Sequence, residues 1–417
     1  MAVFKNLNLF GGKNSLLIGI VIGVLLGGIV GSFFPEFAVK QGFLGDMFLK
    51  ALKMIVLPLI IISITLSIMK IGDPKKLGSM GLKTVLYYAS TTAIAVFIGI
   101  VVVLIISPGE GGQVLTGEIP EKIMGKQDFK ISSILDYFIY PNLFQAATEF
   151  KILPIIVACI LFGVAFATLG KESEIVVKFF EVSEKAVMKI VGWIIIFTPI
   201  GVFSLIADRI GEAGGGAEVF TILSQLAKYS LSVVVGLFVH GFIVLPLILV
   251  LIARRNPIQY LSHLSNALLT AFSTASSSAT LPLTMTSVIE NAKVDKKVGR
   301  FVLPLGATIN MDGTALYEAV AVIFIAQSYG ITLGPSELVI VFFTATLAAI
   351  GAAGIPEAGL VTMVLVLQAV GLPLEGVGLI LSIDWLLDRF RTTINVWGDS
   401  VGCAVIDRFE NKNSPPV

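Results

Sequence analysis

The sequence predicts an all-α polytopic membrane protein in which eight transmembrane helices accompany two re-entrant helical hairpins. Hydrophobic residues make up 56% of the chain and charged residues 14%, and the mean hydropathy is +0.94, which is more apolar than an ordinary soluble domain. Long apolar runs recur along the chain, and several are interrupted by polar clusters. The 29 basic residues are balanced by 28 acidic ones, so we expect no nucleic-acid partner.

The first six spans follow from apolar runs long enough to cross a bilayer, at about 12–34, 44–70, 80–107, 131–170, 180–212 and 227–253. The fourth is expected to be broken, because it contains Pro141 and Pro154. Lysines gather before the first span and between the second and third, and such clusters favour the cytoplasmic side. We therefore expect a multi-pass protein of the cell membrane (plasma or inner membrane) with both termini in the cytoplasm.

Two later segments, at about 256–292 and 335–371, are predicted to be re-entrant hairpins. Polar or small residues split each into two short arms, STASSSATLP at 273–282 and GAAGIPEAG at 351–359. An arm of under ~20 residues reaches only part of the way across the hydrocarbon layer. Non-helical backbone at that depth is tolerated inside protein or beside a wet cavity. Both hairpin tips should therefore point at an internal site.

Each hairpin precedes a long span that carries its own polar cluster and is expected to be interrupted there. The seventh span, at about 298–330, holds NMDGT at 310–314, and the eighth, at about 374–410, holds DWLLDRFRTTINVWGD at 384–399. Two such units of opposite orientation indicate inverted repeats with a binding site near the membrane midplane. This architecture is typical of a transporter, and we expect no enzymatic activity.

The spacing of the polar residues in the eighth span indicates what the site binds. Steps of four, three, four and four residues place these side chains on one helix face: Asp384, Asp388, Arg391, Asn395 and Asp399. An ionisable group at bilayer depth costs at least ~2.5 kcal/mol and usually lines a substrate pathway. The Arg391 guanidinium matches a carboxylate in two hydrogen bonds, and Asp388 can accept from an ammonium group. The pair predicts an acidic amino acid as substrate.

A cation site is predicted beside it. Sodium prefers oxygen ligands, and an unwound NMDG segment frees backbone carbonyls that a continuous helix would use. Asn310, Asp312 and Asp399 are the expected ligands. No cofactor other than coupling sodium ions is expected.

Four segments resemble the signature motifs of the glutamate/aspartate transporters, the dicarboxylate/amino-acid:cation symporters that include the excitatory amino-acid transporters. These segments are SSSATLP, NMDGTALYEA, GAAGIPEAGLVTM and IDWLLDRFRTTINVWGD, and the resemblance extends over the whole chain. An archaeal relative is an established example of inverted repeats. The resemblance implies a homotrimer with an elevator-type movement, in which a scaffold (1–78 and 109–225) holds a mobile transport domain (79–108 and 226–417).

The resemblance also implies the binding residues. The substrate would contact Ala275, Ser276, Ser277, Thr314, Ile355, Gly359, Asp388, Arg391, Thr392 and Asn395. One sodium site would use Gly306, Asn310, Asn395 and Asp399. A second would use Tyr88, Thr91, Thr92, Asn310 and Asp312, and a third Thr308, Met311, Ala349, Ile350 and Ala352.

Two positions depart from the archaeal members of this family. Ala275 stands where they carry an arginine, and we expect Arg389 on the eighth span to supply that guanidinium instead. Glu318 stands where sodium-only relatives carry glutamine, and a buried carboxyl group can carry a proton across the membrane. This position predicts proton co-transport alongside sodium.

Several alternatives stay open. A C4-dicarboxylate symporter of the same fold is the nearest, although Asp388 with Thr392 favours a substrate that bears an ammonium group. A channel would need a continuous polar pore, and an intramembrane hydrolase would need a serine with an oriented base. We interpret Asp384 as a structural partner of Arg389 or Arg391, and His240 and His263 as structural or interfacial.

Overall fold

The computed structural model describes residues 15–71, 78–110, 139–149, 151–212, 218–351 and 358–411, and within these ranges the secondary structure is helical, without strands. The helices that precede the first hairpin are α1 (Ser15–Phe33), α2 (Pro35–Lys40), α3 (Gly42–Ile71), α4 (Gly78–Ile106), α7 (Leu143–Thr148), α8 (Ile152–Thr168), η2 (Gly170–Ser173), α9 (Glu174–Ile195), α10 (Thr198–Glu212), α11 (Glu218–Val239), η3 (His240–Val244), α12 (Leu245–Ile248) and η4 (Leu249–Ala253). The remaining helices are α13 (Pro257–Thr274), α14 (Ser277–Thr286), η5 (Ser287–Asn291), α15 (Lys296–Ile309), α16 (Asp312–Ser328), α17 (Pro335–Gly351), α18 (Ala358–Ala369), η6 (Leu374–Gly376) and α19 (Val377–Glu410).

Four helical stretches among the described residues are long and apolar enough to cross a membrane, and a fifth is obtained if one bent pair is counted as a single span. The four are Pro35–Lys70, Ser79–Ile106, Phe220–Ala253 and Lys296–Ser328. Shorter apolar helices add Ile18–Phe33, Leu153–Thr168 and Pro335–Ile350. These helices identify a multi-pass membrane protein. The most apolar window of the stretch at 296–328 is entirely buried by protein, so that its polar break need not meet lipid.

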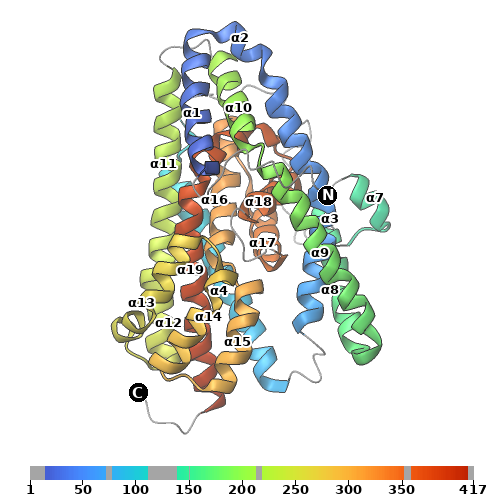
Figure 1. Cartoon of the computed structure of the whole chain (residues 1–417), viewed down its shortest axis with the longest axis vertical. Coiled ribbons are helices and arrows are strands. Elements are labelled where there is room, and N and C mark those ends of the chain that lie inside the picture. The colour runs from blue at the N-terminus through green and yellow to red at the C-terminus, as the bar shows by residue number, and fades with distance from the viewer. Residues whose placement is uncertain are drawn as a thin grey trace.

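The helices pack in two groups (Figure 1). In the first, α1, α2, α3, α8, α9 and α10 pack mainly on one another, and α1 meets α10 through small residues. A side chain at Gly23 would place its Cβ 2.5 Å from the Pro199 carbonyl, so the two backbones touch there. In the second group, α19 runs through the centre against α11, α13, α15 and α16, and α4 covers α16 (Figure 1).

The predicted span at 180–212 is not one straight helix. Helix α9 ends at Ile195, α10 begins at Thr198, and the two are bent by 51°. Pro199 explains the break, because it has no backbone N–H and its ring would clash with the carbonyl four residues earlier. The predicted break in the span at 131–170 is confirmed within the described residues, where α7 and α8 are separate helices.

Both predicted hairpins are pairs of packed helices. Helices α13 and α14 contact each other around the turn at Ala275, and α17 and α18 form the second pair. Ala275 ends α13 in the left-handed conformation, with φ 49°, and the Ser276 hydroxyl caps α14 by accepting from the Ala279 N–H at 3.2 Å. Ser276 therefore has a capping role in the turn. That the hairpins re-enter the membrane remains a prediction.

The two long spans after the hairpins differ from each other. The expected interruption in the seventh is confirmed, because α15 ends at Ile309 and α16 begins at Asp312, with extended backbone at Asn310. The expected interruption in the eighth is wrong, because α19 is continuous from Val377 to Glu410. Its polar side chains share one face and pair with each other and with α16, so the backbone of α19 keeps its own hydrogen bonds.

Candidate functional site

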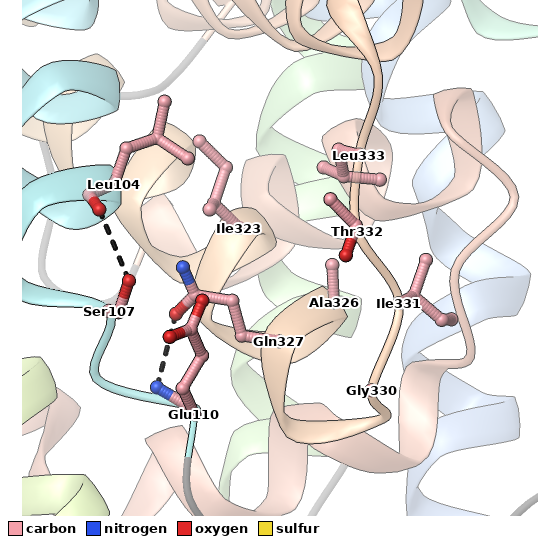
Figure 2. Close-up of a pocket in the computed structure, with 11 residues that line it drawn as sticks. Leu104, Ser107, Glu110, Ile323, Ala326, Gln327, Gly330, Ile331, Thr332 and Leu333 are labelled. Carbon is pink, nitrogen blue, oxygen red and sulfur yellow. Dashed lines mark hydrogen bonds between the residues drawn. The ribbon is translucent and has the colours of Figure 1, made fainter.

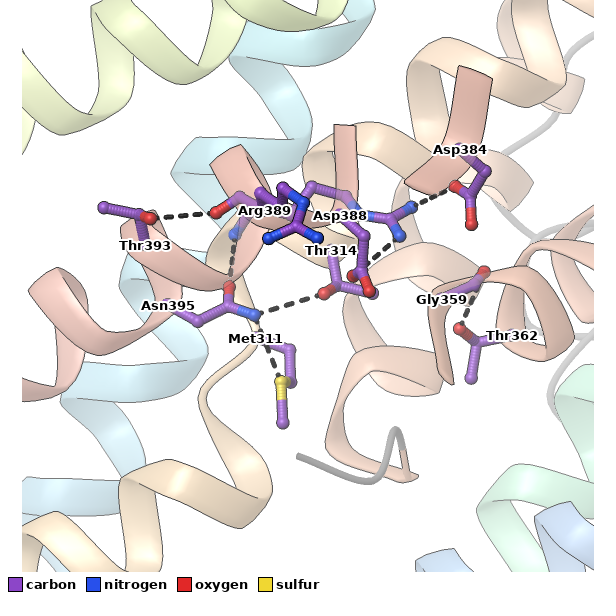
Figure 3. A network of polar contacts seen from close by, with 11 residues as sticks. Met311, Thr314, Gly359, Thr362, Asp384, Asp388, Arg389, Thr393 and Asn395 are labelled. Atoms are coloured by element: carbon purple, nitrogen blue, oxygen red, sulfur yellow. Dashed lines mark hydrogen bonds and ion pairs between the residues drawn. The ribbon is translucent and has the colours of Figure 1, made fainter. Parts of the chain in front are cut away.

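The guanidinium of Arg391 lies between Asp384 and Asp388 in a buried polar cluster, in which Figure 3 labels both of these aspartates. Its Nη1 donates to Asp384 at 2.9 Å and its Nη2 to Asp388 at 2.8 Å. All three residues lie on α19, and Arg391 is 0% exposed. The predicted structural pairing of Asp384 is confirmed with Arg391. A cation held between two carboxylates leaves one negative charge in excess, which suits a site that also receives an ammonium group.

Two other elements close around this guanidinium. The Tyr317 ring on α16 lies 3.8 Å from the Arg391 Cζ atom, a cation–π contact. At the beginning of α18, a Cβ at Gly359 would lie 3.1 Å from Arg391 Nη1. The second hairpin thus approaches the guanidinium at a residue without a side chain. Gly359, which the sequence predicted to contact the substrate, therefore lies beside Arg391.

Asn395 connects α19 to the break between α15 and α16 (Figure 3). Its Oδ1 accepts from the Gly313 N–H at 2.7 Å, and its Nδ2 donates to the Thr314 hydroxyl at 3.2 Å. A Cβ at Gly313 would lie 2.5 Å from the Arg391 carbonyl oxygen, so the two helices meet backbone to backbone. The structure therefore brings together Thr314, Gly359, Asp388, Arg391 and Asn395 from three elements.

A second cluster of buried oxygen atoms lies one to two turns further along α19. Asn310 Nδ2 donates to Asp399 Oδ1 at 2.9 Å, and Asn310 Oδ1 has no hydrogen-bond partner among the described residues. Gly306 lies against the same carboxylate, because a Cβ there would be 2.5 Å from Asp399 Oδ1 and equally close to the Tyr88 hydroxyl. Carboxylate, amide and hydroxyl oxygens are a donor set that suits a hard cation such as sodium.

Asp312 stands beside these groups and is held from two helices. Its Oδ1 accepts from the Thr92 hydroxyl on α4 at 2.7 Å, and its Oδ2 faces His240 Nε2 at 3.1 Å. Asp312 and His240 are both 0% exposed. The Thr91 hydroxyl donates within its own helix to the Tyr87 and Tyr88 carbonyls at 3.2 Å, and the Tyr88 hydroxyl donates to the Val302 carbonyl at 3.1 Å.

The tip of the first hairpin is bound to α19 by Arg389, the residue that follows Asp388. Arg389 Nη1 donates to the carbonyl oxygens of Phe272 and Ser273 at 3.1 and 2.8 Å. The Phe272 and Phe390 rings lie edge to face with centroids 5.2 Å apart. Ala275 and Ser277 follow these contacts at the tip, and Ser277 is buried. Arg389 therefore binds the hairpin backbone, whereas Arg391 faces the central cluster.

The other predicted residues are placed as follows. Thr392, Met311 and Ala349 are buried, and the Met311 sulfur accepts from Asn395 Nδ2 at 3.3 Å. Thr308 and Ile350 are partly buried, and the Thr308 hydroxyl donates to the Leu305 carbonyl at 2.8 Å. The predictions for Ala352 and Ile355 lie outside the described residues.

Glu318 lies on the same side of α16 as Thr314, one turn further along. It is 0% exposed, and neither of its carboxyl oxygens has a hydrogen-bond partner among the described residues. The Thr362 hydroxyl and the Arg391 guanidinium are within interaction range of it. An ionised carboxylate without partners is costly to bury, whereas a protonated one is much less so.

A hollow of about 310 Å³ lies at the opposite end of α16 (Figure 2). It is lined by Leu104, Ser107, Gly109, Glu110, Ile323, Ala326, Gln327, Gly330, Ile331, Thr332 and Leu333. The Gly109 N–H donates to Gln327 Oε1 at 3.1 Å. This hollow is separate from the buried polar clusters and contains none of the predicted site residues.

Two contacts of the site were not predicted from the sequence. His240 was interpreted as structural or interfacial, yet it faces Asp312, and Tyr317 stacks on Arg391. The residue spacing predicts that Tyr317 shares a helix face with Asn310 and Thr314, but it does not predict the contact with Arg391. His240 gave no such signal, because it lies in a π-helical turn that shifts the register of its helix.

Comparison with known proteins identifies the family. Residues 15–409 match the model of the sodium:dicarboxylate symporter family. The chain is 41% identical to a putative sodium-dependent excitatory amino acid transporter, glt-4, of Caenorhabditis elegans, over 95% of this chain and 90% of that protein. It is 39% identical to excitatory amino acid transporter 3 of Mus musculus, with 95% and 85% covered, and 38% identical to excitatory amino acid transporter 2 of Homo sapiens, with 95% and 79% covered. The chain therefore belongs to the sodium:dicarboxylate symporter family.

Proposed function

We propose that this protein is a secondary active symporter that carries acidic amino acids, L-aspartate or L-glutamate, into the cell together with sodium ions. The observation that carries the proposal is the completely buried Arg391 between Asp384 and Asp388. A buried guanidinium can hold a substrate carboxylate in two hydrogen bonds. The names of the relatives, which describe excitatory amino acid transporters, point to the same substrate class.

The contacts of Asp388 suggest how both charges of the substrate are recognised. Asp388 pairs with Arg391 Nη2 at 2.8 Å. A substrate carboxylate that takes over this Nη2 would release Asp388, which could then accept from the substrate ammonium group. Asp384 would keep its bond to Nη1, so that the guanidinium stays oriented during the exchange. A dicarboxylate without an ammonium group would offer this buried carboxylate no positive charge in place of Nη2, which is costly.

The sodium ions would be bound by the oxygen atoms around the break between α15 and α16. Asn310, Asp312 and Asp399 supply two carboxylates and one amide, and Asn310 Oδ1 has no partner among the described residues. Thr92 and Tyr88 add hydroxyl oxygens from α4, and the carbonyl of Gly306 lies on the same helix as Asn310. Because the three proposed cation sites lie near one substrate site, the binding of sodium and the binding of substrate would influence each other electrostatically.

During transport, one of the two packing groups would move relative to the other. The helices α1, α2, α3, α8, α9 and α10 would form the scaffold of a homotrimer, and α4 together with α11 to α19 the mobile transport domain. Both polar clusters lie within the second group, so substrate and ions would travel with it. Both termini would face the cytoplasm. Glu318 would carry a proton, because its burial without a hydrogen-bond partner favours the neutral form.

Uptake of labelled L-aspartate into proteoliposomes tests this proposal, with sodium and pH gradients imposed separately. Uptake should require the sodium gradient, and a lower pH outside the proteoliposomes than inside should increase the uptake further. Glu318→Gln should lose the effect of the pH gradient and keep exchange of internal for external aspartate. Glu290→Gln, at an exposed glutamate after α14, is the matched control and should behave as the wild type.

Two results would contradict the proposal. Uptake that ignores the sodium gradient would exclude sodium symport, and pH-driven uptake by Glu318→Gln would exclude Glu318 as the proton carrier. Succinate, which lacks the ammonium group, should compete poorly with aspartate. Equal uptake of succinate would favour the C4-dicarboxylate alternative.

A further inference from the structure

The carboxylate of Asp312 is held from two sides by residues of different helices. Thr92 on α4 donates to its Oδ1 at 2.7 Å, and His240 at the end of α11 faces its Oδ2 at 3.1 Å. All three side chains are buried, and His240 and Asp312 are 0% exposed. Asp312 is the first residue of α16 and follows the backbone break. No preceding turn of the same helix packs against its side chain. Its orientation therefore depends on these two contacts.

The helix that contains His240 is distorted at this residue. Residues His240–Val244 form a π-helical turn between α11 and α12. The Gly241 carbonyl in the same turn accepts from the Trp397 indole N–H at 2.8 Å, so the turn is also anchored to α19. Such turns insert one residue and change which side chains face a neighbouring helix. Here the turn directs the imidazole to α16.

The hydrogen-bonding state of His240 follows from its surroundings. Its Nε2 faces a carboxylate, whereas its Nδ1 is buried without a hydrogen-bond partner among the described residues. A proton on Nε2 pairs the N–H with Asp312 and leaves an acceptor unpaired at Nδ1. The opposite tautomer would set an acceptor against a carboxylate. The imidazole therefore donates to Asp312 Oδ2 through Nε2–H.

We propose that His240 is a positioning residue for sodium binding at Asp312. Its Nε2–H fixes one carboxylate oxygen while Thr92 fixes the other, and each oxygen keeps a second lone pair for the ion. Sodium affinity would then depend on a helix that supplies no ligand of its own. Partners that orient a ligand typically change metal affinity by 10- to 100-fold when removed. This inference rests on the proposed sodium role of Asp312.

Sodium binding without substrate separates this role from a merely structural one. The wild type and the variants are purified in detergent and titrated with sodium chloride, while choline chloride keeps the ionic strength constant. The unfolding temperature and the tryptophan fluorescence are measured at each sodium concentration. Trp397 is a suitable reporter because its indole N–H binds the turn that contains His240. His240→Met, which has no donor, should need about tenfold more sodium for half-saturation. His240→Gln retains an N–H donor and should recover most of this loss. His263→Gln and His263→Met, at the other histidine of the chain, should match the wild type.

The outcomes distinguish this inference from the proposed function. Asp312→Asn should weaken sodium binding more than His240→Met does. An unchanged sodium affinity in Asp312→Asn would remove Asp312 as a ligand and with it part of the proposed function. Weakened binding in Asp312→Asn with wild-type binding in His240→Met would overturn the inference alone. Equal losses in His240→Gln and His240→Met would also overturn it, because donor chemistry would then not matter. If His240→Met does not fold, His240→Leu serves as the variant without a donor.

Discussion

At the scale of single residues, the site depends on glycines as well as on polar side chains, because residues without a side chain allow other helices to approach Arg391 closely. Gly313 and Gly359 bring the backbones of α16 and α18 against Arg391, and a Cβ at either would lie 2.5 to 3.1 Å from atoms of that residue. These contacts fix the position of the guanidinium between Asp384 and Asp388. A long, flexible cation becomes preorganised for a carboxylate in this way.

Gly313→Ala should therefore weaken substrate binding. Its Cβ would overlap the Arg391 carbonyl oxygen at 2.5 Å, and that atom belongs to the backbone of α19 and cannot turn away. Overpacking of this kind costs about 1–3 kcal/mol, which corresponds to a loss of affinity of roughly 5- to 150-fold when the cost falls on the bound state. Isothermal titration with L-aspartate measures it. Gly192→Ala is the control, since nothing lies within 4 Å of a Cβ there, and equal affinities of the two variants would refute the steric argument.

At the scale of elements, the tip of the first hairpin depends on one residue of α19. Helix α13 ends at Thr274 with carbonyl groups that have no helical partner, and Arg389 binds those of Phe272 and Ser273. A cation at the carboxyl end of a helix also interacts favourably with the helix dipole. The turn that follows contains Ala275 in a left-handed conformation, with φ 49°, which costs about 1–2 kcal/mol for a residue with a Cβ. The hairpin tip is thus strained and held by Arg389.

Arg389→Ala should loosen this tip without unfolding the protein. Two hydrogen bonds from a charged donor are lost, and because this contact is partly exposed to solvent they contribute together on the order of 1.5 kcal/mol. Hydrogen exchange of the amides at 272–279 should become about tenfold faster, while exchange in α15 stays unchanged. Arg389→Lys keeps the positive charge and N–H donors but loses the planar guanidinium, and it should give an intermediate rate. If the rates at the tip do not differ between Arg389→Ala and the wild type, the hairpin is held by other contacts.

The elements also show which parts of the fold the sequence could predict. The break at Asn310 was predictable, because an asparagine, an aspartate and a glycine occur together within an apolar span. The four- and three-residue steps predicted the common face of Asp384, Asp388 and Arg391. The continuity of α19 was not predicted, since the same polar residues could equally have marked a break. The bend before Pro199 was overlooked in a long apolar run.

The contact between His240 and Asp312 could not be predicted for a different reason. These residues are 72 positions apart, and the π-helical turn that joins them changes the helical register on which periodicity arguments depend. The partners of Arg389 could not be predicted either, although the residue spacing placed Arg391 on the face of Asp388. They depend on how α19 packs against α13. Tertiary contacts between distant elements are what single-sequence patterns lack.

At the scale of the whole molecule, a group of charged side chains is buried inside the protein. Asp312, Glu318, Asp384, Asp388, Arg391 and Asp399 are all less than 10% exposed, and the outer faces of α1, α4 and α11 carry exposed apolar side chains. These six residues lie in one of the two packing groups, around α16 and α19, whereas the buried Arg209 lies on α10 in the other group. Such a distribution is suited to moving bound cargo across a membrane inside protein, and it is the basis of the proposed transport domain.

The identity of the group that Arg391 binds tests the account most directly. Uptake of L-aspartate and of a neutral amino acid such as L-serine is compared in proteoliposomes under a sodium gradient, for the wild type and for Arg391→Cys. Loss of a buried charge pair with the substrate carboxylate costs roughly 3 kcal/mol or more, so aspartate uptake at low concentration should fall at least about 100-fold. Asp388 remains to bind the ammonium group, so serine should no longer be disfavoured relative to aspartate. Undiminished aspartate uptake by Arg391→Cys, with serine still excluded, would contradict the central claim that this guanidinium selects the acidic side chain.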